Sequence, residues 1–244
     1  MDCLDLLLAS ADGRSKPGNA AVVAVIGSGG KSTLLRALGE RAAARGRRVA
    51  LATTTHFLAF EGMPLVTSGE QDDVRAALSR DGIACVGTPT GDSLGRLGAP
   101  ALGIGGLARV ADLVLVEADG SKRLPLKAHA SHEPVVPPEA TVTVDVVGAS
   151  GFGGRVGNVV HRAELLRERL GCDANDEATP ELMARSMADE IARGLIAPTH
   201  VIVNQVEGAE RIEAARRFAA ALREWGCELP VFLGSIRDGR LERA

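Results

Sequence analysis

Aromatic residues are scarce in this sequence, which contains no Tyr, one Trp and five Phe among 244 residues. Proteins that bind single-stranded nucleic acid stack the bases on aromatic rings, so this function is disfavoured. Excess positive charge is also lacking, because 28 Lys and Arg residues face 31 Asp and Glu residues, for a formal net charge of −3. A nucleic-acid binder normally carries a basic stripe. We therefore expect an aliphatic core and no nucleic-acid partner.

Metal-type cysteine pairs and long apolar runs are absent as well. None of the four cysteines stands at the CxxC or CxxH spacing of a zinc site, so buried free thiols are expected at Cys3, Cys85, Cys172 and Cys227. The longest apolar run, residues 20–26, is far shorter than the roughly 20 residues of a membrane span. The apolar run 6–9 follows acidic rather than basic residues, which argues against a signal peptide. The sequence thus predicts a cytoplasmic protein with no membrane partner.

What the sequence does contain is an alternation of strand-like and helix-like segments. The patterns predict strands at residues 21–26, 49–53, 83–86, 112–116, 141–147, 199–203 and 231–233, and helices at 4–9, 32–45, 74–79, 162–170, 180–193 and 209–225. Strands joined by crossover helices favour a doubly wound, mostly parallel α/β sheet with helices on both faces. We expect one domain over residues 1–244, with a short helix and linker in 1–20.

Three details of this organisation are expectations that a structure can check. The alternation in strand 141–147 suggests that one of its faces is more exposed, and strand 231–233 is expected to be the last. The Gly- and Pro-rich stretch 87–106 is expected to be a long functional or mobile loop. A second Gly-rich loop is expected at 148–157.

The first strand ends in a glycine-rich segment, Ile26-Gly27-Ser28-Gly29-Gly30-Lys31-Ser32-Thr33. Glycines let backbone amides converge on phosphate oxygens, and the helix that follows adds the positive end of its dipole. In such a P-loop, Lys31 reaches the β- and γ-phosphates and Ser32 binds Mg²⁺. We therefore expect nucleotide binding by Gly27, Ser28, Gly29, Gly30, Lys31, Ser32 and Thr33, on a P-loop NTPase-like three-layer sandwich.

The loop departs from the longest form of this motif. The pattern G-x-x-x-x-G-K-[ST] requires a first glycine where Val25 stands, so the loop has the shorter form GxxGK[ST], similar to that of Mur-type ligases. A dinucleotide fingerprint fits Gly27 and Gly29 but places Ser32 where Gly or Ala belongs, and residues 53–55 lack its acidic residue. We reject that alternative, while an ordinary glycine turn before a helix stays open.

An apolar run at residues 113–116 ends in two acids, Glu117 and Asp119, which resembles a Walker B strand. Two residues apart in an extended chain, their side chains point to the same side. One is expected to bind Mg²⁺ and the other to orient a water or hydroxyl nucleophile, although the spacing does not assign the two roles. The expected catalytic residues are Lys31, Glu117 and Asp119, and the expected metal ligands are Ser32, Glu117 and Asp119.

Further polar residues stand at the ends of other strands. Residues 53–56 read Thr-Thr-Thr-His, so Thr54, Thr55 and His56 are candidates to contact a γ-phosphate, a metal-bound water or an acceptor. The alternative is that Thr favours strands and the histidine caps the loop. After the acids come Lys122 and Lys127, positive charges that suit an anionic ligand, or simply a solvated loop.

The strand at 199–203 runs into Asn204-Gln205-Val206-Glu207, the layout of the base-reading N-K-x-D motif of GTP-binding proteins. Asn204 is placed to hydrogen-bond a purine edge. Because Gln205 replaces Lys and Glu207 replaces Asp, guanine specificity is doubtful, and ATP and GTP both remain candidates. A polar strand-to-helix junction is the alternative.

Taken together, these motifs resemble the YqeC family, accessory proteins of selenium-dependent molybdenum hydroxylases. The resemblance is carried by GSGGKST (27–33), TTTH (53–56) and EADGSKRLPLK (117–127), and supported by HEPVVP (132–137), HR (161–162) and NQVE (204–207). It implies P-loop nucleotide binding and, as partners, a molybdenum hydroxylase or its cofactor-maturation proteins. It also points to His132, His161 and Arg162 as acceptor-side residues, although His132 with the following Glu-Pro is alternatively a structural turn.

Two classes of function follow from these residues. The first is an enzyme, a Mg²⁺-dependent ATP or GTP hydrolase or phosphoryl transferase, with a Mur-like ligase as a variant. The second is a nucleotide-gated binding module or chaperone for a metal cofactor, with slow hydrolysis and a switch in residues 87–106. The sequence does not choose between them.

Overall fold

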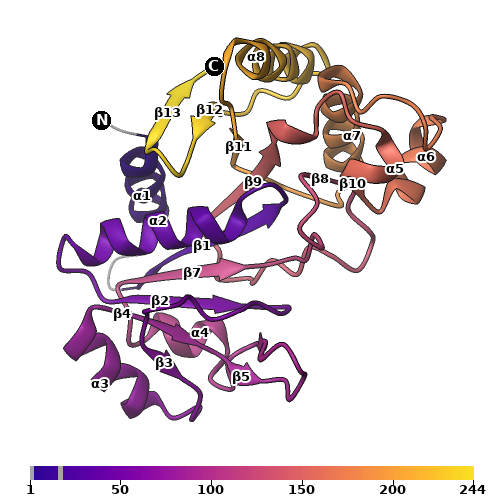
Figure 1. The fold of residues 1–244 in the computed structure, drawn as a ribbon. Helices are drawn as coiled ribbons and strands as arrows, with labels where there is room; N and C mark the ends of the chain where they lie inside the picture. Colours follow the sequence, from indigo (N-terminus) through magenta and orange to yellow (C-terminus); the bar gives the residue numbers. More distant parts are fainter. Residues whose placement is uncertain (1–2, 16–18) are drawn as a thin grey trace.

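The structure is a computed structural model, and it describes residues 3–15 and 19–244. Within these residues nine strands form one sheet (Figure 1). From edge to edge they are β13 (Arg240–Arg243), β12 (Val231–Ser235), β11 (His200–Asn204), β9 (Val142–Gly148), β1 (Ala21–Gly27), β7 (Leu113–Glu117), β2 (Val49–Thr53), β4 (Ile83–Val86) and β3 (Leu65–Val66). All neighbouring pairs are parallel except β12 with β13.

Helices cover both faces of this sheet, which makes three layers (Figure 1). One face is covered by α1 (Cys3–Arg14) and α2 (Lys31–Ala43). The other face is covered by α3 (Gln71–Asp81) and α4 (Gly103–Ala108) at one half, and by α6 (Ala163–Leu170), α7 (Pro180–Ala192) and α8 (Ala209–Glu224) at the other half. The predicted doubly wound, mostly parallel α/β sheet is therefore confirmed.

Shorter elements lie near the ends of the sheet strands. Two-residue strands form two small ribbons, antiparallel β5 (Thr88–Pro89) with β6 (Leu97–Gly98) and parallel β8 (Leu126–Lys127) with β10 (Val160–His161). The remaining helical turns are η1 (Ala149–Gly151) and α5 (Val156–Val159).

The core is aliphatic, as the composition predicts. Strand β1 reads AVVAVIG and every residue in it is buried, because helices cover it on both faces. The buried face of α7 is oriented by its first turn, where the Thr179 side chain accepts a hydrogen bond from the Leu182 backbone and Pro180 occupies the first helical turn. This fixes the helix against β9 and β11, beside the ends of the central strands.

Several expectations about individual elements were wrong. Strand β9 has no exposed face: all seven of its residues are buried, since it lies inside the sheet between β1 and β11. The N-terminal helix extends to Arg14, so the expected linker begins inside it, and residues 16–18 of that linker lie outside the described residues.

The stretch 87–106 and the C-terminus also differ from expectation. The stretch is not one long loop, because it holds the β5–β6 ribbon and the start of α4. Strand β12 is not the last, since β13 pairs with it at the edge of the sheet. Among residues 3–15 and 19–244, no helix combines the length and apolar character that crossing a membrane requires.

Candidate functional site

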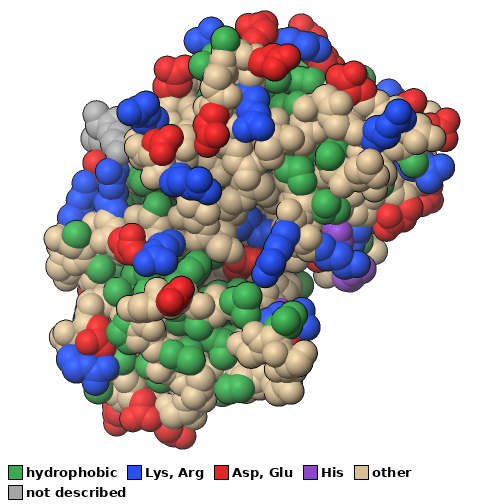
Figure 2. Space-filling model, viewed as in Figure 1, with side chains coloured by type: hydrophobic (Ala, Val, Ile, Leu, Met, Phe, Trp, Pro, Cys, Tyr) green, Lys and Arg blue, Asp and Glu red, His purple; other side chains and the backbone are tan. Residues whose placement is uncertain are grey.

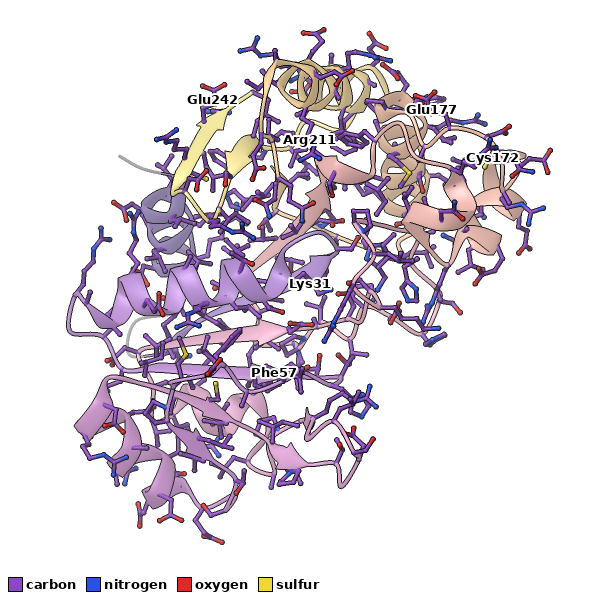
Figure 3. The ribbon with its side chains drawn as sticks, in the orientation of Figure 1. Lys31, Phe57, Cys172, Glu177, Arg211 and Glu242 are labelled. Atoms are coloured by element: carbon purple, nitrogen blue, oxygen red, sulfur yellow. The ribbon has the colours of Figure 1, made fainter. Side chains whose placement is uncertain are left out.

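The candidate site lies where the chain leaves β1 and enters α2. Strand β1 is flanked by β7 on one side and β9 on the other, so the crossovers diverge at this point of the sheet. In doubly wound sheets, ligands bind in the crevice at the carboxyl ends of the strands beside such a switch point. Figure 3 labels Lys31 at the end of α2 that faces this edge of the sheet.

The loop between β1 and α2 requires its glycines. Gly27 has a φ of 85° and Gly29 a φ of 80°, a region that L side chains rarely adopt. A Cβ atom on Gly27 would collide with Asp145 and with the Val146 carbonyl, and one on Gly29 would collide with the backbone of Gly148. The first half of the loop is thus packed against β9, with Gly27 and Ser28 buried, whereas Gly29 and Gly30 are partly exposed.

A buried carboxylate, Asp119, lies beneath this loop. It accepts hydrogen bonds from the Gly27 backbone N–H (2.9 Å) and the Lys127 ammonium (2.8 Å). The Lys31 ammonium is 3.1 Å from Asp119 Oδ1. His129 Nε2 lies 3.1 Å from Asp119 Oδ2, the oxygen that also accepts from Gly27 and Lys127. Burial alone would raise the pKa of Asp119, but the hydrogen bond from His129 and the charges of Lys31 and Lys127 outweigh it and hold the pKa well below its usual range. Asp119 therefore connects the loop to two lysines.

Lys31 is folded back onto its own loop. Its ammonium donates a hydrogen bond to the Gly27 carbonyl (2.7 Å) as well as pairing with Asp119, and the side chain is buried. A phosphate group placed on the loop would compete with Asp119 for this ammonium group. The Gly27 carbonyl and the Asp119 carboxylate thus bind Lys31 where no phosphate competes for it.

The structure separates the two acids that sequence spacing left equivalent. Glu117, the last residue of β7, accepts a hydrogen bond from the Ser32 hydroxyl (3.2 Å), whereas Asp119 is enclosed by cationic groups. Burial raises the pKa of Glu117, and the charge of Lys31 only partly opposes this. A hydroxyl beside an under-compensated carboxylate is an oxygen donor set that suits Mg²⁺, while Asp119 has little capacity left for a cation.

No cluster of three or more His, Cys, Asp or Glu side chains is arranged to hold a metal ion in the described part of the chain. The protein alone therefore forms no complete metal cage. Mg²⁺ commonly binds through one or two protein oxygens together with substrate phosphates and waters, so the pair Ser32 and Glu117 fits such a shared site.

Three residues that the sequence analysis missed, His129, Glu190 and Arg169, complete the network under the loop. His129 Nδ1 lies 2.7 Å from Glu190 of α7, whose other oxygen accepts a hydrogen bond from the His129 backbone. Arg169 pairs with Glu190 at 3.2 Å and donates to the His129 carbonyl at 2.7 Å. Burial opposes the charge on His129, but its hydrogen bonds with Asp119 and Glu190 prevail and raise its pKa to about 9. The imidazolium thus links α7 to the P-loop.

A fourth missed residue, Asp145 of β9, lines a small cavity beside the loop. The cavity measures about 20 Å³, room for about one water molecule. Asp145 Oδ2 and the Ser28 hydroxyl both line it, and neither has a hydrogen-bond partner among the described residues. Burial raises the pKa of Asp145 to about 7, with His129 partly opposing and Asp119 adding to the rise.

The expected acceptor-side residues come together next to Asp119. Glu133 Oε1 pairs with Lys127 at 2.6 Å and with Arg162 at 3.0 Å, and the other amino group of Arg162 is 3.3 Å from His132 Nε2. His161 is the register partner of Lys127 in the β8–β10 ribbon. These residues, which lie far apart in the sequence, therefore form one cluster.

Hydroxyl groups of segment 53–56 contact the backbone of neighbouring strands and loops. The Thr53 hydroxyl donates to the Glu117 carbonyl (2.8 Å) and the Thr54 hydroxyl to the Val135 carbonyl (2.6 Å), while the Thr55 backbone donates to Thr53. The hydroxyls of Thr53 and Thr54 thus donate to backbone carbonyls, and the His56 side chain is exposed. The turn fixes the end of β7, and a role in ligand contact stays a prediction.

Asn204 is engaged at both ends of its side-chain amide. Its Nδ2 donates to the Gly29 carbonyl (2.8 Å), and its Oδ1 accepts from the Ile236 backbone (2.9 Å). A Cβ atom on Gly30 would collide with this amide. The structure gives Asn204 the task of holding the P-loop against β11, and base reading stays a prediction.

A family model described as YqeC protein matches residues 23–164. A curated relative, the uncharacterized protein YqeC of Escherichia coli (strain K12), is 30% identical over 203 residues, which cover 81% of this chain and 76% of that protein.

Solved structures of FtsY are more distantly similar. Chloroplast FtsY from Physcomitrella patens is 16% identical with a TM-score of 0.49, and the match covers 99% of this chain and 70% of that one. The cell division protein FtsY from Thermotoga maritima is 15% identical with a TM-score of 0.46, covering 99% and 72%.

Proposed function

The chain belongs to the YqeC family, and from this premise we propose that it is a Mg²⁺-dependent P-loop protein that binds ATP or GTP. We propose further that it hydrolyses the nucleotide or transfers its γ-phosphoryl group, as a cytoplasmic accessory factor in the maturation of a selenium-dependent molybdenum hydroxylase. One observation carries the proposal. The glycine loop opens α2 at Lys31, at the switch point of the sheet, and the Ser32 hydroxyl lies 3.2 Å from Glu117.

In this proposal each residue of the loop has a distinct task. The backbone amides of Gly29 and Gly30 and the N-terminus of α2 bind the phosphates, while the amides of Gly27 and Ser28 stay bonded to Asp119 and Val146. Lys31 leaves Asp119 and binds the β- and γ-phosphate oxygens, while Ser32 and Glu117 hold Mg²⁺. When bound, Mg²⁺ neutralises charge on the phosphate oxygens and orients them. Ser32 and Thr33 are exposed at the first turn of α2, open to such a ligand.

We assign Asp119 to positioning rather than to the metal. Its carboxylate accepts a hydrogen bond from the Gly27 backbone N–H and lies within about 3 Å of the charged groups of Lys31, Lys127 and His129. Moving it to a metal ion would leave those cations without their buried counter-charge, which is unfavourable. Among the residues that the structure describes, the Glu117 carboxylate has the Ser32 hydroxyl as its one side-chain partner, which makes it the better candidate for Mg²⁺.

A nucleotide-gated switch is the second candidate, and the contacts of Lys31 favour it. If phosphate draws Lys31 away from Asp119, the charge balance of Asp119, Lys127 and His129 changes at the same time. Because His129 contacts Glu190 on α7, the change reaches another layer of the protein. Turnover separates the two candidates: an enzyme turns over with a small acceptor or water alone, whereas a switch accelerates only with its partner protein.

The test is to measure nucleotide affinity and turnover for Glu117→Gln and Asp119→Asn, each with and without Mg²⁺. The matched control is Glu40→Gln, an exposed acid on the same helix as Ser32. Glu117→Gln should retain binding in the absence of Mg²⁺ but lose the gain that Mg²⁺ gives to wild type. Asp119→Asn should weaken binding in both conditions, because it removes the buried carboxylate that fixes the Gly27 end of the loop. A Glu117→Gln variant with undiminished Mg²⁺ dependence contradicts the metal assignment.

A further inference from the structure

Cationic residues beside the P-loop adopt a backbone conformation that is costly for them. Four non-glycine residues in the described part of the chain have positive φ, and three carry positive charge: Lys122 (47°), Arg123 (63°) and Arg162 (61°). L-residues avoid this region, and such strain concentrates at ligand-binding positions. Lys122 and Arg123 lie a few residues after Glu117 and Asp119, on the same edge of the sheet as the loop.

Arg162 is held in place by a buried acid. Its Nη1 lies 3.0 Å from Glu133, which also pairs with Lys127, and Lys127 in turn pairs with Asp119 at 2.8 Å. The other amino group of Arg162 donates to His132 Nε2 at 3.3 Å. One carboxylate of this cluster is therefore shared by two cations, and the fork of Arg162 faces the exposed His132 side chain.

His161 is buried in this cluster without a protein partner. Its side chain is 8% exposed, and neither ring nitrogen has a hydrogen-bond partner among the described residues. Because His161 and Lys127 are register partners in parallel strands, their side chains project from the same face of the ribbon. Burial lowers the pKa of His161, and the charges of Lys127, Arg162 and Lys122 lower it further, while the Glu133 charge partly opposes them. The neutral imidazole offers one N–H donor to a ligand.

We propose that Lys122, His132, His161 and Arg162, with Lys127 behind them, form a surface site for the phosphate group of a second ligand, beside the nucleotide. We call it the anion pocket. Lys127 is already paired with both Asp119 and Glu133, so the charge open to an anion comes from Lys122 and Arg162, of which Arg162 also pairs with Glu133. The planar fork of Arg matches phosphate oxygens, and the exposed Lys122 ammonium and the His161 imidazole add point-like donors, while Lys127 stays bonded to Asp119, Gly120 and Glu133. Figure 2 shows histidine side chains among Lys and Arg side chains at the right of the view, below the region of α5 and β10.

The anion pocket is coupled to the P-loop through one carboxylate. Asp119 contacts Lys127 of the pocket on one side, and Lys31 and the Gly27 amide on the other. A phosphate ligand in the pocket would therefore lie next to the nucleotide's phosphate end. The inference rests on the proposed function, because it takes the P-loop as the nucleotide site and the pocket as the site of the second substrate.

The experiment is calorimetric titration of phenyl phosphate into protein saturated with Mg²⁺ and a non-hydrolysable ATP analogue, with benzoate as the carboxylate of the same shape. Saturation with the analogue fills the P-loop, so phosphate bound in its presence reports another site. The variants are Lys122→Gln and Arg162→Gln, with Arg216→Gln as a matched control on α8, since that side chain is 61% exposed. Lys122→Gln leaves the buried pairs intact and so keeps the test valid if Arg162→Gln unfolds.

Wild type and Arg216→Gln should bind phenyl phosphate more tightly than benzoate, and Lys122→Gln and Arg162→Gln should weaken it by about tenfold or more. Lys31→Ala should retain phenyl phosphate while losing the ATP analogue. The pocket is overturned if wild type fails to bind phenyl phosphate, if benzoate binds equally well, or if Lys31→Ala alone abolishes phosphate binding. If no nucleotide binds but phenyl phosphate still depends on Lys122 and Arg162, the proposed function fails and the anion pocket stands.

Discussion

Replacing Asp145 by Asn should stabilise the protein at alkaline pH. The carboxyl group is 2% exposed, its Oδ2 has no hydrogen-bond partner among the described residues, and the Asp119 charge lies near it. Burial raises its pKa from 3.8 to about 7, with His129 partly opposing the rise. The folded protein therefore holds a proton at this site that the unfolded chain gives up at lower pH.

The sign and size of the effect follow from this difference. Because the folded state binds more protons between the two pKa values, the free energy of unfolding falls as pH rises from about 4 to about 7 and then stays lowered. A pKa of about 7 in place of 3.8 corresponds to roughly 4 kcal/mol at most. The Asn amide has nearly the same shape and no charge, so the variant does not incur this loss.

Urea unfolding followed by circular dichroism measures the difference directly. The advantage of Asp145→Asn over wild type should widen by roughly 2 kcal/mol between about pH 5.5 and about pH 8. Asp173→Asn is the control, because that side chain is 83% exposed. Parallel pH profiles for wild type and Asp145→Asn, or a variant less stable than wild type at the higher pH, would refute the assignment of a raised pKa to Asp145.

Two further predictions concern groups that hold the loop. Glu190→Gln should lower the pKa of His129 from about 9 towards 6.5, as followed by NMR titration of the imidazole. Because the folded-state pKa of His129 is raised, the charged imidazole stabilises the fold fully below about pH 6.5, and this stabilisation is lost as pH rises through about 9. In the variant the stabilisation should disappear at lower pH than in wild type. An unchanged His129 titration contradicts the pairing with Glu190. Asn204→Ala should leave the Ile236 N–H unsatisfied, cost about 1–3 kcal/mol, and weaken ATP, GTP and CTP alike through Gly29. A loss confined to one base would instead support base reading by Asn204.

The central sheet was predictable because its strands carry local signals. Strands β1 and β7 are continuous apolar runs, and both ends of α2 were located to within two residues. Strand β13 was missed because it is a short, exposed edge strand that reads Arg-Leu-Glu-Arg, with no apolar alternation. In β9, the polar side chains of Thr143 and Asp145 suggested exposure, yet both are buried by the layers on either side.

In the candidate site, too, the residues that stand in a short local motif were predictable and those that meet only in the fold were not. The P-loop and the acids at the end of β7 were predictable, since a few consecutive residues carry the motif. The roles of those acids were not, because they depend on contacts across layers: Glu190 is 61 residues from His129 in sequence, and nothing in the pattern of α7 distinguishes it from a surface acid. Lys127 and His161 meet only through a ribbon two residues long.

The central claim is that the loop from Gly27 to Ser32 binds the phosphates of a nucleotide with Mg²⁺. The most direct test is calorimetric titration with ATP, GTP and CTP, each with and without Mg²⁺, on wild type and Lys31→Ala. The account predicts Mg²⁺-dependent binding of at least one nucleotide by wild type and its loss in a folded Lys31→Ala variant. Equal affinity in the two proteins, or no binding by folded wild type, would contradict the claim.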